Sequence, residues 1–308
     1  SFYVEESFVI AWMYPYLEPY GIIMKINRDP LPKITPEMVA HNRKYWDDYA
    51  KKYLLSDPRF RRDDDAQRAF SKLRTAHAGL YAWRSVMAPP EFRQPELAAE
   101  AEFAFRHALE LCPFNVEATF RFAEFLSRLE RYDDAIKVVE TYRKQDPYNQ
   151  QINVVLGQIG ALKQGALQEQ VLRQELAVNP GNLNAIMQLL GVLGSRGKMA
   201  EMDAIIDQII EKKELPAQHF KTIAQTYVQL NRMDRVELVL RKYLGFYADD
   251  AQAWYDLCVV YAQLQQTEKA LDALDRAVKL NPQFKQGAQN DPRLPQLKLS
   301  PRFKQLTQ

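Results

Sequence analysis

The histidines and paired carboxylates are the residues most able to support metal binding or acid–base catalysis, and their spacing favours neither. The four histidines are His41, His77, His107 and His219. They are scattered along the chain without the short spacing of metal ligands. Glu5 and Glu6 are adjacent, but neighbouring residues of a strand point to opposite faces, so the two carboxylates would not face one substrate together. The sequence therefore predicts no metal site.

Glycines and cysteines are the remaining candidates for chemistry. Gly157, Gly160 and Gly165 lie inside a repeat rather than after a strand, so they do not form a phosphate-binding loop. Cys112 precedes a proline and Cys258 takes a position that needs a small apolar side chain, so both are expected to be structural. No motif in the sequence places a nucleophilic side chain beside a base that could activate it. We expect no catalytic residue and no cofactor, and interpret the chain as a non-enzyme.

The composition argues against nucleic-acid binding and against a membrane-spanning helix. The net charge is only +2, which gives no strong field toward polyanions. The longest unbroken apolar stretch, Phe8–Tyr14, is far shorter than the roughly 20 residues that a transmembrane helix needs. With 47% apolar residues, the chain has enough to bury a large core. No basic segment followed by an apolar segment indicates a signal peptide.

The stretch Ala251–Phe284 has the clearest periodic pattern. Apolar or small residues with the spacing of one helical face occupy Trp254, Leu257, Cys258 and Tyr261. A second helical face follows at Ala270, Ala273, Leu274 and Ala277. Pro282 ends the second helix, because proline cannot continue the hydrogen-bond ladder. The positions and spacing predict two helices packed as a hairpin, and they resemble a tetratricopeptide repeat.

The pattern recurs upstream at a nearly constant interval, which matches the length of a tetratricopeptide repeat. One hairpin cannot bury its apolar face alone, so the recurrence predicts a stack. The five predicted repeats are 116–149, 150–182, 183–216, 217–250 and 251–284. The resemblance implies an all-α fold, a tetratricopeptide-type helical-hairpin solenoid.

Two further segments extend the predicted solenoid. Residues 66–115 read as an atypical hairpin, in which Ala66–Met87 and Glu96–Leu111 are joined by the proline-rich loop Ala88–Pro95. Residues 285–308 read as a tail of short turns that covers the exposed face of the last repeat, because a terminal repeat needs capping.

The first sixty residues do not follow the period. Residues 1–30 form a small α/β segment, with short strands predicted at Phe2–Val4 and Ile22–Ile26, and are interpreted as the remnant of a larger domain. Residues 31–65 are predicted to hold a linker helix and a charged loop. This helix should begin after Thr35 and run to about Leu55, with Met38, Tyr45, Trp46, Tyr49 and Tyr53 on its packing face.

A second resemblance covers about residues 1–85. The segments that carry it are Tyr3–Ser7, Trp12–Pro15 and Gly21–Arg28. They resemble the segment after the transmembrane part of bacterial polytopic membrane proteins that are similar to protein O-mannosyltransferases. The catalytic acids of that family lie in the membrane module, so none is carried over. The resemblance implies an extracytoplasmic, periplasmic tail of a membrane-anchored parent chain, with a cytoplasmic location as the alternative.

Tetratricopeptide repeats present their first helices along a concave groove, and the resemblance places a set of polar residues there. The candidate peptide-binding residues are Asn184, Gln188, Gly191, Lys221, Gln225, Gln229 and Tyr255. The amides could pair with peptide N–H and C=O groups, while Lys221 adds a charge and Tyr255 an aromatic platform. Gly191 would let a peptide backbone approach closely, or would serve helix packing together with Gly194. Families that grip a C-terminal carboxylate use lysine, asparagine and arginine at these positions. Only Lys221 fits that pattern, and Gln225 stands where asparagine is expected.

The sequence thus predicts a non-catalytic protein-interaction scaffold whose partner is a protein or peptide. The alternative is a structural or regulatory extracytoplasmic tail of a membrane glycosyltransferase-like protein that has no independent partner. A polar groove that binds nothing is the plainer interpretation of the same residues.

Overall fold

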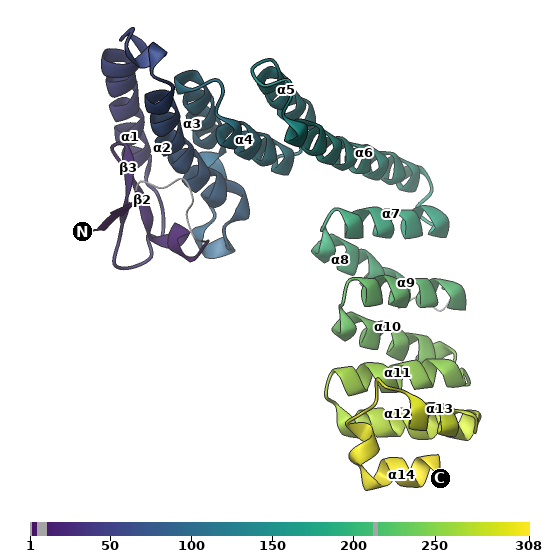
Figure 1. Cartoon of the computed structure of the whole chain (residues 1–308). Coiled ribbons are helices and arrows are strands. Elements are labelled where there is room, and N and C mark those ends of the chain that lie inside the picture. The colour runs from purple at the N-terminus through teal and green to yellow at the C-terminus, as the bar shows by residue number, and fades with distance from the viewer. Residues whose placement is uncertain (1, 5–10, 212–214) are drawn as a thin grey trace. The chain divides into compact units, whose positions relative to one another are not determined.

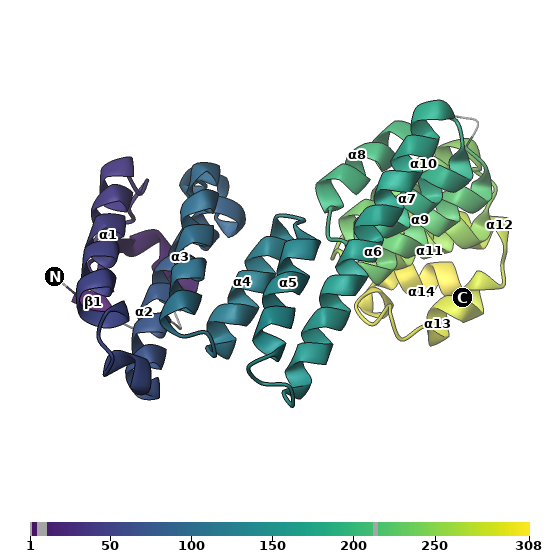
Figure 2. The same cartoon turned by 90° about the horizontal axis from the view of Figure 1, so that it is seen from above.

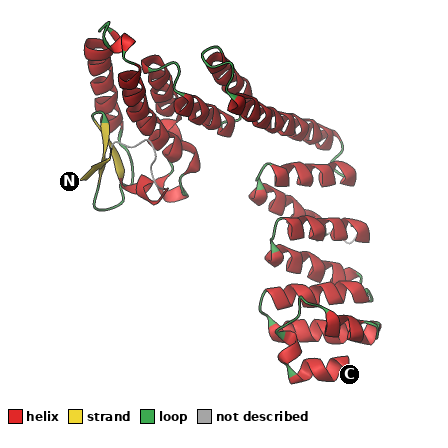
Figure 3. Ribbon diagram, viewed as in Figure 1, coloured by secondary structure: helices red, strands yellow, loops and turns green. Residues whose placement is uncertain are grey.

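The chain forms two compact units, residues 1–166 and 167–308 (Figures 1 and 2). The structure, a computed structural model, describes residues 2–4, 11–211 and 215–308. The predicted Glu5–Glu6 pair lies outside the described residues. Helices dominate both units, and one small sheet lies near the N-terminus (Figure 3). The predicted fold class, an all-α hairpin repeat protein with a small α/β segment at its start, is confirmed.

The sheet has three antiparallel strands, β1 (Phe2–Val4), β2 (Leu17–Tyr20) and β3 (Ile23–Ile26), in the order β1-β3-β2. Two of them were predicted and β2 was not. Its sequence contains Pro19, which cannot donate to a ladder, and β2 accommodates it because it is an edge strand. Gly21 makes the tight turn to β3 at a φ of 58°. Leu17 and Met24 are fully buried.

The helix predicted after Thr35 is present as α1 (Pro36–Tyr49), which continues as a π-helical turn, Ala50–Leu55. The Thr35 hydroxyl accepts the backbone N–H of Met38, 3.3 Å away, as an N-cap. Trp46 is fully buried, whereas Tyr45 and Tyr53 are 39% and 54% exposed. The predicted packing face is therefore narrower than the sequence suggested.

The atypical hairpin consists of α2 (Asp64–Ala82), extended by a π-helical turn, and α3 (Ala98–Leu111). Buried polar side chains fasten the N-terminal segment to it. The Arg84 guanidinium donates to the carbonyls of Pro32 (3.0 Å) and Leu31 (2.7 Å). The Gln94 amide pairs with both backbone groups of Ile34, at 2.8 and 2.9 Å. These bonds make the segment an integral part of the first unit.

The first unit continues through the hairpin of α4 (Val116–Arg128) and α5 (Tyr132–Arg143) into α6 (Gln150–Val178). The repeat predicted over 150–182 is wrong as a hairpin, because α6 is one continuous helix. Ile152 and Ile159 belong to the core of the first unit, and Leu172 to that of the second.

Two local features explain the missing turn. The other repeats turn at a residue of positive φ, namely Glu130, Gly197, Asn231 and Gln265, whereas the corresponding residues Lys163 and Gln164 are helical. The residues that hold a hairpin together are also missing. Buried Thr119, Ala123 and Leu126 of the preceding repeat correspond to exposed Asn153, Gly157 and Gly160. Without inward-facing apolar side chains, a second helix has nothing to pack against.

The second unit stacks three hairpins (Figure 1). They are α7 (Leu183–Ser195) with α8 (Met199–Ile210), α9 (Ala217–Gln229) with α10 (Met233–Phe246), and α11 (Ala251–Gln263) with α12 (Thr267–Leu280). Gly197, Asn231 and Gln265 turn the three hairpins at equal intervals along the chain. Side chains of Asn182 and Asp250 cap α7 and α11. These hairpins confirm the predicted period.

The C-terminal tail packs against the last hairpin. It forms α13 (Phe284–Asn290) and α14 (Pro301–Thr307), with Leu294, Leu297 and Phe303 buried in the same core as α11 and α12. Leu299, by contrast, is 80% exposed. None of the helices in the described ranges combines the length and the apolar character that crossing a bilayer requires.

Candidate functional site

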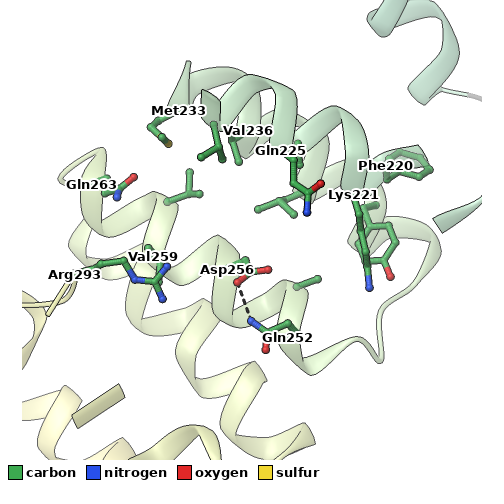
Figure 4. A pocket seen from close by; sticks show the side chains of 16 residues that line it. Phe220, Lys221, Gln225, Met233, Val236, Gln252, Asp256, Val259, Gln263 and Arg293 are labelled. Atoms are coloured by element: carbon green, nitrogen blue, oxygen red, sulfur yellow. Dashed lines mark hydrogen bonds between the residues drawn. The ribbon is translucent and has the colours of Figure 1, made fainter. Parts of the chain in front are cut away.

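A cavity of about 340 Å³ opens between α9, α10 and α11 of the second unit (Figure 4). Its inner wall consists of apolar side chains that continue the core outward. These are Ala224, Val228, Met233, Val236, Leu240, Val259 and Val260. Val228 is 49% exposed, so an apolar side chain from a partner could reach this wall. A concave, mostly apolar cavity with a few polar groups is the usual form of a ligand site.

Polar side chains surround the apolar wall. They are Lys221, Gln225, Gln252, Asp256, Gln263 and Arg293. The first two come from α9, the next three from α11, and Arg293 from the tail. Because α9 and α11 are the first helices of adjacent hairpins, the site lies on the surface where the sequence predicted a groove.

At one end of the cavity, Lys221 forms a small network. Its ammonium lies 3.2 Å from the Asp250 carboxylate and 5.7 Å from the centre of the Tyr243 ring. The Tyr243 hydroxyl donates to Asp250 at 2.6 Å. Although burial acts to raise it, the pKa of Asp250 is lowered by the hydrogen bonds from Tyr243, the Ala253 N–H and Lys221. The network holds the lysine at the rim of the cavity.

In the middle of the cavity, Asp256 accepts a hydrogen bond from the Gln252 amide at 2.8 Å (Figure 4). Burial raises the pKa of Asp256, and the Gln252 bond acts against that rise. The pair presents one carboxylate and one amide to a ligand. Such groups can accept from and donate to a peptide backbone.

At the other end, Arg293 is fixed by the tail itself. Its guanidinium donates to the Asp291 carboxylate at 2.6–3.1 Å, and the Tyr255 hydroxyl donates to the same carboxylate at 2.9 Å. The hydrogen bonds from Arg293 hold the pKa of Asp291 far below its ordinary value. The Tyr255 ring also stacks on Phe284, with centroids 4.9 Å apart. Tyr255 therefore anchors the tail.

Of the seven predicted groove residues, the structure brings only Lys221 and Gln225 to this cavity. Asn184, Gln188 and Gly191 lie on α7, and Gln229 lies exposed at the end of α9, all outside the cavity lining. The prediction for Tyr255 as an open aromatic platform is wrong, because Tyr255 is only 6% exposed. A position that faces the groove in an internal repeat is covered by the tail in this last one.

The two glycines of α7 differ in their surroundings. A Cβ at Gly191 would meet nothing within 4 Å, whereas one at Gly194 would lie 3.4 Å from the Met202 sulfur. Gly194 thus serves helix packing, as the plainer interpretation held. At Gly191 the surface is open.

The apolar wall and Arg293 were not among the groove residues predicted from the sequence. Val228 lies one helical turn after Gln225 on α9, and Val259 lies one turn after Asp256 on α11. This spacing in the sequence indicates that the valines share a face with the polar groove residues. Arg293 lies outside the repeats, and no periodic pattern places it beside Asp256.

The first unit gathers two histidines that the sequence showed as scattered. His77 and His107 both meet the Trp46 ring edge-on, at 5.8 Å. Burial and the neighbouring Arg74 lower the pKa of His77 to about 3 and that of His107 to about 4, so both rings are neutral at pH 7. Within the described ranges, no three His, Cys, Asp or Glu residues gather as a metal site.

Comparison with known proteins supports the repeat assignment. Residues 251–284 match the family model of the tetratricopeptide repeat. The matched segment is one hairpin of the second unit, and the turns of the two preceding hairpins recur at the same interval along the chain. No curated protein matches the chain.

Several solved repeat proteins are similar to the chain at low identity. One is YrrB, a tetratricopeptide-repeat protein with an unusual peptide-binding site, with 19% identity over 58% of this chain and 93% of that chain at a TM-score of 0.29. Another, from Parabacteroides merdae, has 15% identity over 80% of this chain and 88% of its own at a TM-score of 0.29. A third, from Thermus thermophilus, has 18% identity over 61% of this chain and 85% of its own, at a TM-score of 0.22. Similarity this low indicates nothing about what the chain binds.

Proposed function

We propose that the chain is a non-catalytic interaction scaffold, and that the cavity between α9, α10 and α11 binds an extended peptide segment of a protein partner. One apolar side chain of the peptide inserts against Val228, Val236 and Val259. The peptide backbone runs along the rim, where Gln225, Gln252 and Gln263 supply donors and acceptors.

The observation that carries this proposal is the combination of an apolar wall with uncharged amides on two adjacent first helices. Apolar burial supplies the affinity, and the amides satisfy the peptide groups that would otherwise lose their water. Lys221 and Arg293, both cationic, stand at opposite ends of the lining, so they would favour acidic residues on both sides of the apolar side chain.

Selection from a random peptide display library against the intact chain tests the proposal. We expect the selected peptides to share an apolar residue and to bind the chain with a Kd of roughly micromolar size, as measured by calorimetry. Val228→Arg should weaken their binding at least about tenfold, because an arginine there fills the cavity and charges its wall.

Val154→Arg is the matched control. Val154 is 59% exposed and Val228 is 49% exposed, and Val154 lies on α6 outside the cavity. The control should bind the selected peptides as the wild type does. Peptides that tolerate Val228→Arg, or a library that yields no enriched sequence, would reject the groove as the binding site.

The alternative role, a structural tail of a membrane-anchored glycosyltransferase-like protein, rests on the sequence resemblance over about 1–85 alone. The coding sequence upstream of this segment tests it. About ten apolar spans there would support the alternative, and their absence would reject it. The exposed aromatic residues of the sheet, Phe2 and Tyr20, would then be candidates for contact with the parent chain.

A further inference from the structure

A second cleft, of about 450 Å³, lies between α10, α11 and α12. Among the residues that the structure describes, it shares none with the lining of the first cavity, the proposed peptide cavity. Its floor is aromatic and apolar, with Leu244, Leu257, Tyr261 and Ala273 buried and Trp254 half-buried. The Trp254 indole is held in place by donation of its N–H to the Ala248 carbonyl, at 2.8 Å.

Basic side chains surround this floor. Arg241, Lys269 and Arg276 line the cleft, and among the described residues Asp272 is its one acidic lining residue. Asp272 is engaged from outside the cleft by the Arg302 guanidinium, which donates to its carboxylate at 2.5 Å. Arg241 has a loose pairing with Glu237 at 3.6 Å, and its side chain is 64% exposed. The lining therefore carries an excess of two positive charges, as many as the net charge of the whole chain.

Lys269 and Arg276 line the cleft, and within the described part of the chain neither lies within 4 Å of a carboxylate. Lys269 instead lies 5.5 Å from the centre of the Tyr261 ring, on the aromatic floor. Most other arginines and lysines of these hairpins, such as Arg232, Arg235 and Lys279, have acidic neighbours. The cations of the cleft are thus available to an external anion.

We infer that this cleft is a second docking site, for an acidic polypeptide segment that carries an apolar or aromatic side chain. The apolar side chain packs between Trp254 and Tyr261, and flanking carboxylates pair with Lys269 and Arg276. Charge complementarity favours an acidic partner. A floor that separates the cations with apolar surface favours a polypeptide over a phosphate backbone. The net charge of the chain is only +2, which gives no strong field toward a polyanion.

The test uses the intact chain and a capped peptide with a central phenylalanine flanked by two glutamates on each side. Calorimetry should show saturable binding that weakens as salt is raised. A matched peptide with glutamines in place of the glutamates should bind at least about tenfold more weakly if charge pairing contributes as inferred. Equal binding of the two peptides would overturn the inference.

Two substitutions locate the site. The double variant Lys269→Glu with Arg276→Glu should weaken binding of the acidic peptide at least about tenfold. Its charge-matched control pairs Lys304→Glu with Lys285→Glu, since Lys304 and Lys285 lie on the tail outside the cleft lining. A comparable loss in the control would show nonspecific attraction and overturn the inference.

Gly245→Leu tests the cleft by shape rather than charge. Gly245 lines the cleft on α10, and a Cβ there would meet nothing within 4 Å. The helix tolerates leucine better than glycine, so the melting temperature should not fall. We expect the larger side chain to displace the peptide. Unchanged binding of the acidic peptide to Gly245→Leu would reject an acidic polypeptide as the ligand. Duplex DNA or phosphatidylserine vesicles that bind more tightly than the peptide, and lose that binding in the variant with Lys269→Glu and Arg276→Glu, would reject it too.

Discussion

Arg232 and Asp203, which are 29 positions apart, meet across two consecutive hairpins with 3.3 Å between guanidinium and carboxylate. The same separation recurs in Lys198 with Glu169, at 3.1 Å, and in Arg131 with Glu102. In each pair, the basic residue directly follows a turn residue of positive φ, and the acid belongs to the preceding helical layer. A charge at one repeat position thus ties three hairpins to the helix before them, whereas the hairpin of α11 and α12 has the uncharged Gln266 at that position.

Glu169 is the best-buried acid of this series and should matter most. It is 6% exposed and accepts from Arg173 and Lys198 at 2.8–3.2 Å, and also pairs with Arg196. Glu169→Gln removes the buried negative charge that these cations share, so we expect a loss of about 2–3 kcal/mol in the free energy of unfolding, as measured by urea titration. Glu124→Gln, which breaks an exposed pair with Arg128, should cost no more than about 0.5 kcal/mol. Equal costs for the two variants would contradict this account.

Two aromatic residues at the same repeat position should differ in their contribution to stability. Phe220 is 1% exposed, whereas Trp254, at the same position of the next repeat, is half-buried beside the basic cleft. Phe220→Ala should cost about 3–5 kcal/mol, and Trp254→Ala about 1–2 kcal/mol, because less surface is removed from the core. Thermal or urea unfolding of both variants measures the difference. The reverse order would show that the Trp254 ring is more deeply buried than the Phe220 ring.

Stability should fall with acid because of His77. Its ring is fully buried, with its two nitrogens 3.0 and 3.1 Å from the carbonyls of Leu73 and Ile23, and burial beside Arg74 lowers its pKa to about 3. Since the folded pKa is below the unfolded one, its stabilising contribution is complete above about pH 6.5 and is lost as the pH falls toward 3.

This single group contributes a slope of up to about 1.4 kcal/mol per pH unit within that window. Urea unfolding from pH 7 to pH 4 measures the slope, with His77→Gln as the comparison. The glutamine variant should show a shallower dependence, because an amide does not titrate. Parallel curves for the two proteins would mean that the pKa of His77 does not differ between the folded and unfolded states.

The continuous helix α6 makes a geometric prediction. Val154 and Val178 are both exposed and belong to this one helix. At a rise of about 1.5 Å per residue, their Cα atoms should be about 36 Å apart. Spin labels on cysteines at the two positions, measured by pulsed dipolar spectroscopy, report this separation, and the native Cys112 and Cys258 are both buried. A separation of less than half that value would restore the hairpin that the sequence period suggested.

The sequence predicted the hairpins well because the apolar positions of a repeat decide both helices and their packing. Leu189, Ile223 and Leu257 occupy one position in three successive repeats and are all buried. The same reasoning failed at α6. The segment has the length of one repeat, but Gly157 and Gly160 supply no side chains against which a second helix could pack. A period predicts a hairpin only when the residues that hold it are present.

The candidate site was less predictable, since it depends on contacts between elements. Lys221 and Gln225 were placed by the repeat position alone. Tyr255 occupies an equivalent position, but Phe284 and Asp291 from the tail cover it. Conversely, Arg293 enters the cavity through a non-repetitive segment. Strand β2 was missed for a similar reason, because only its pairing with β3 makes a proline-containing segment a strand.

The tail also decides how the second unit can be divided. A fragment that ends at residue 284 would retain all three of its hairpins and the whole of the segment matched by the repeat family. It would also lose Arg293 from the peptide cavity, release the Tyr255 hydroxyl from Asp291, and expose the surface now covered by Leu294, Leu297 and Phe303. Boundaries drawn at the last repeat would therefore remove one of the polar residues that line the candidate site, so the proposed peptide binding needs the tail to be present in its test.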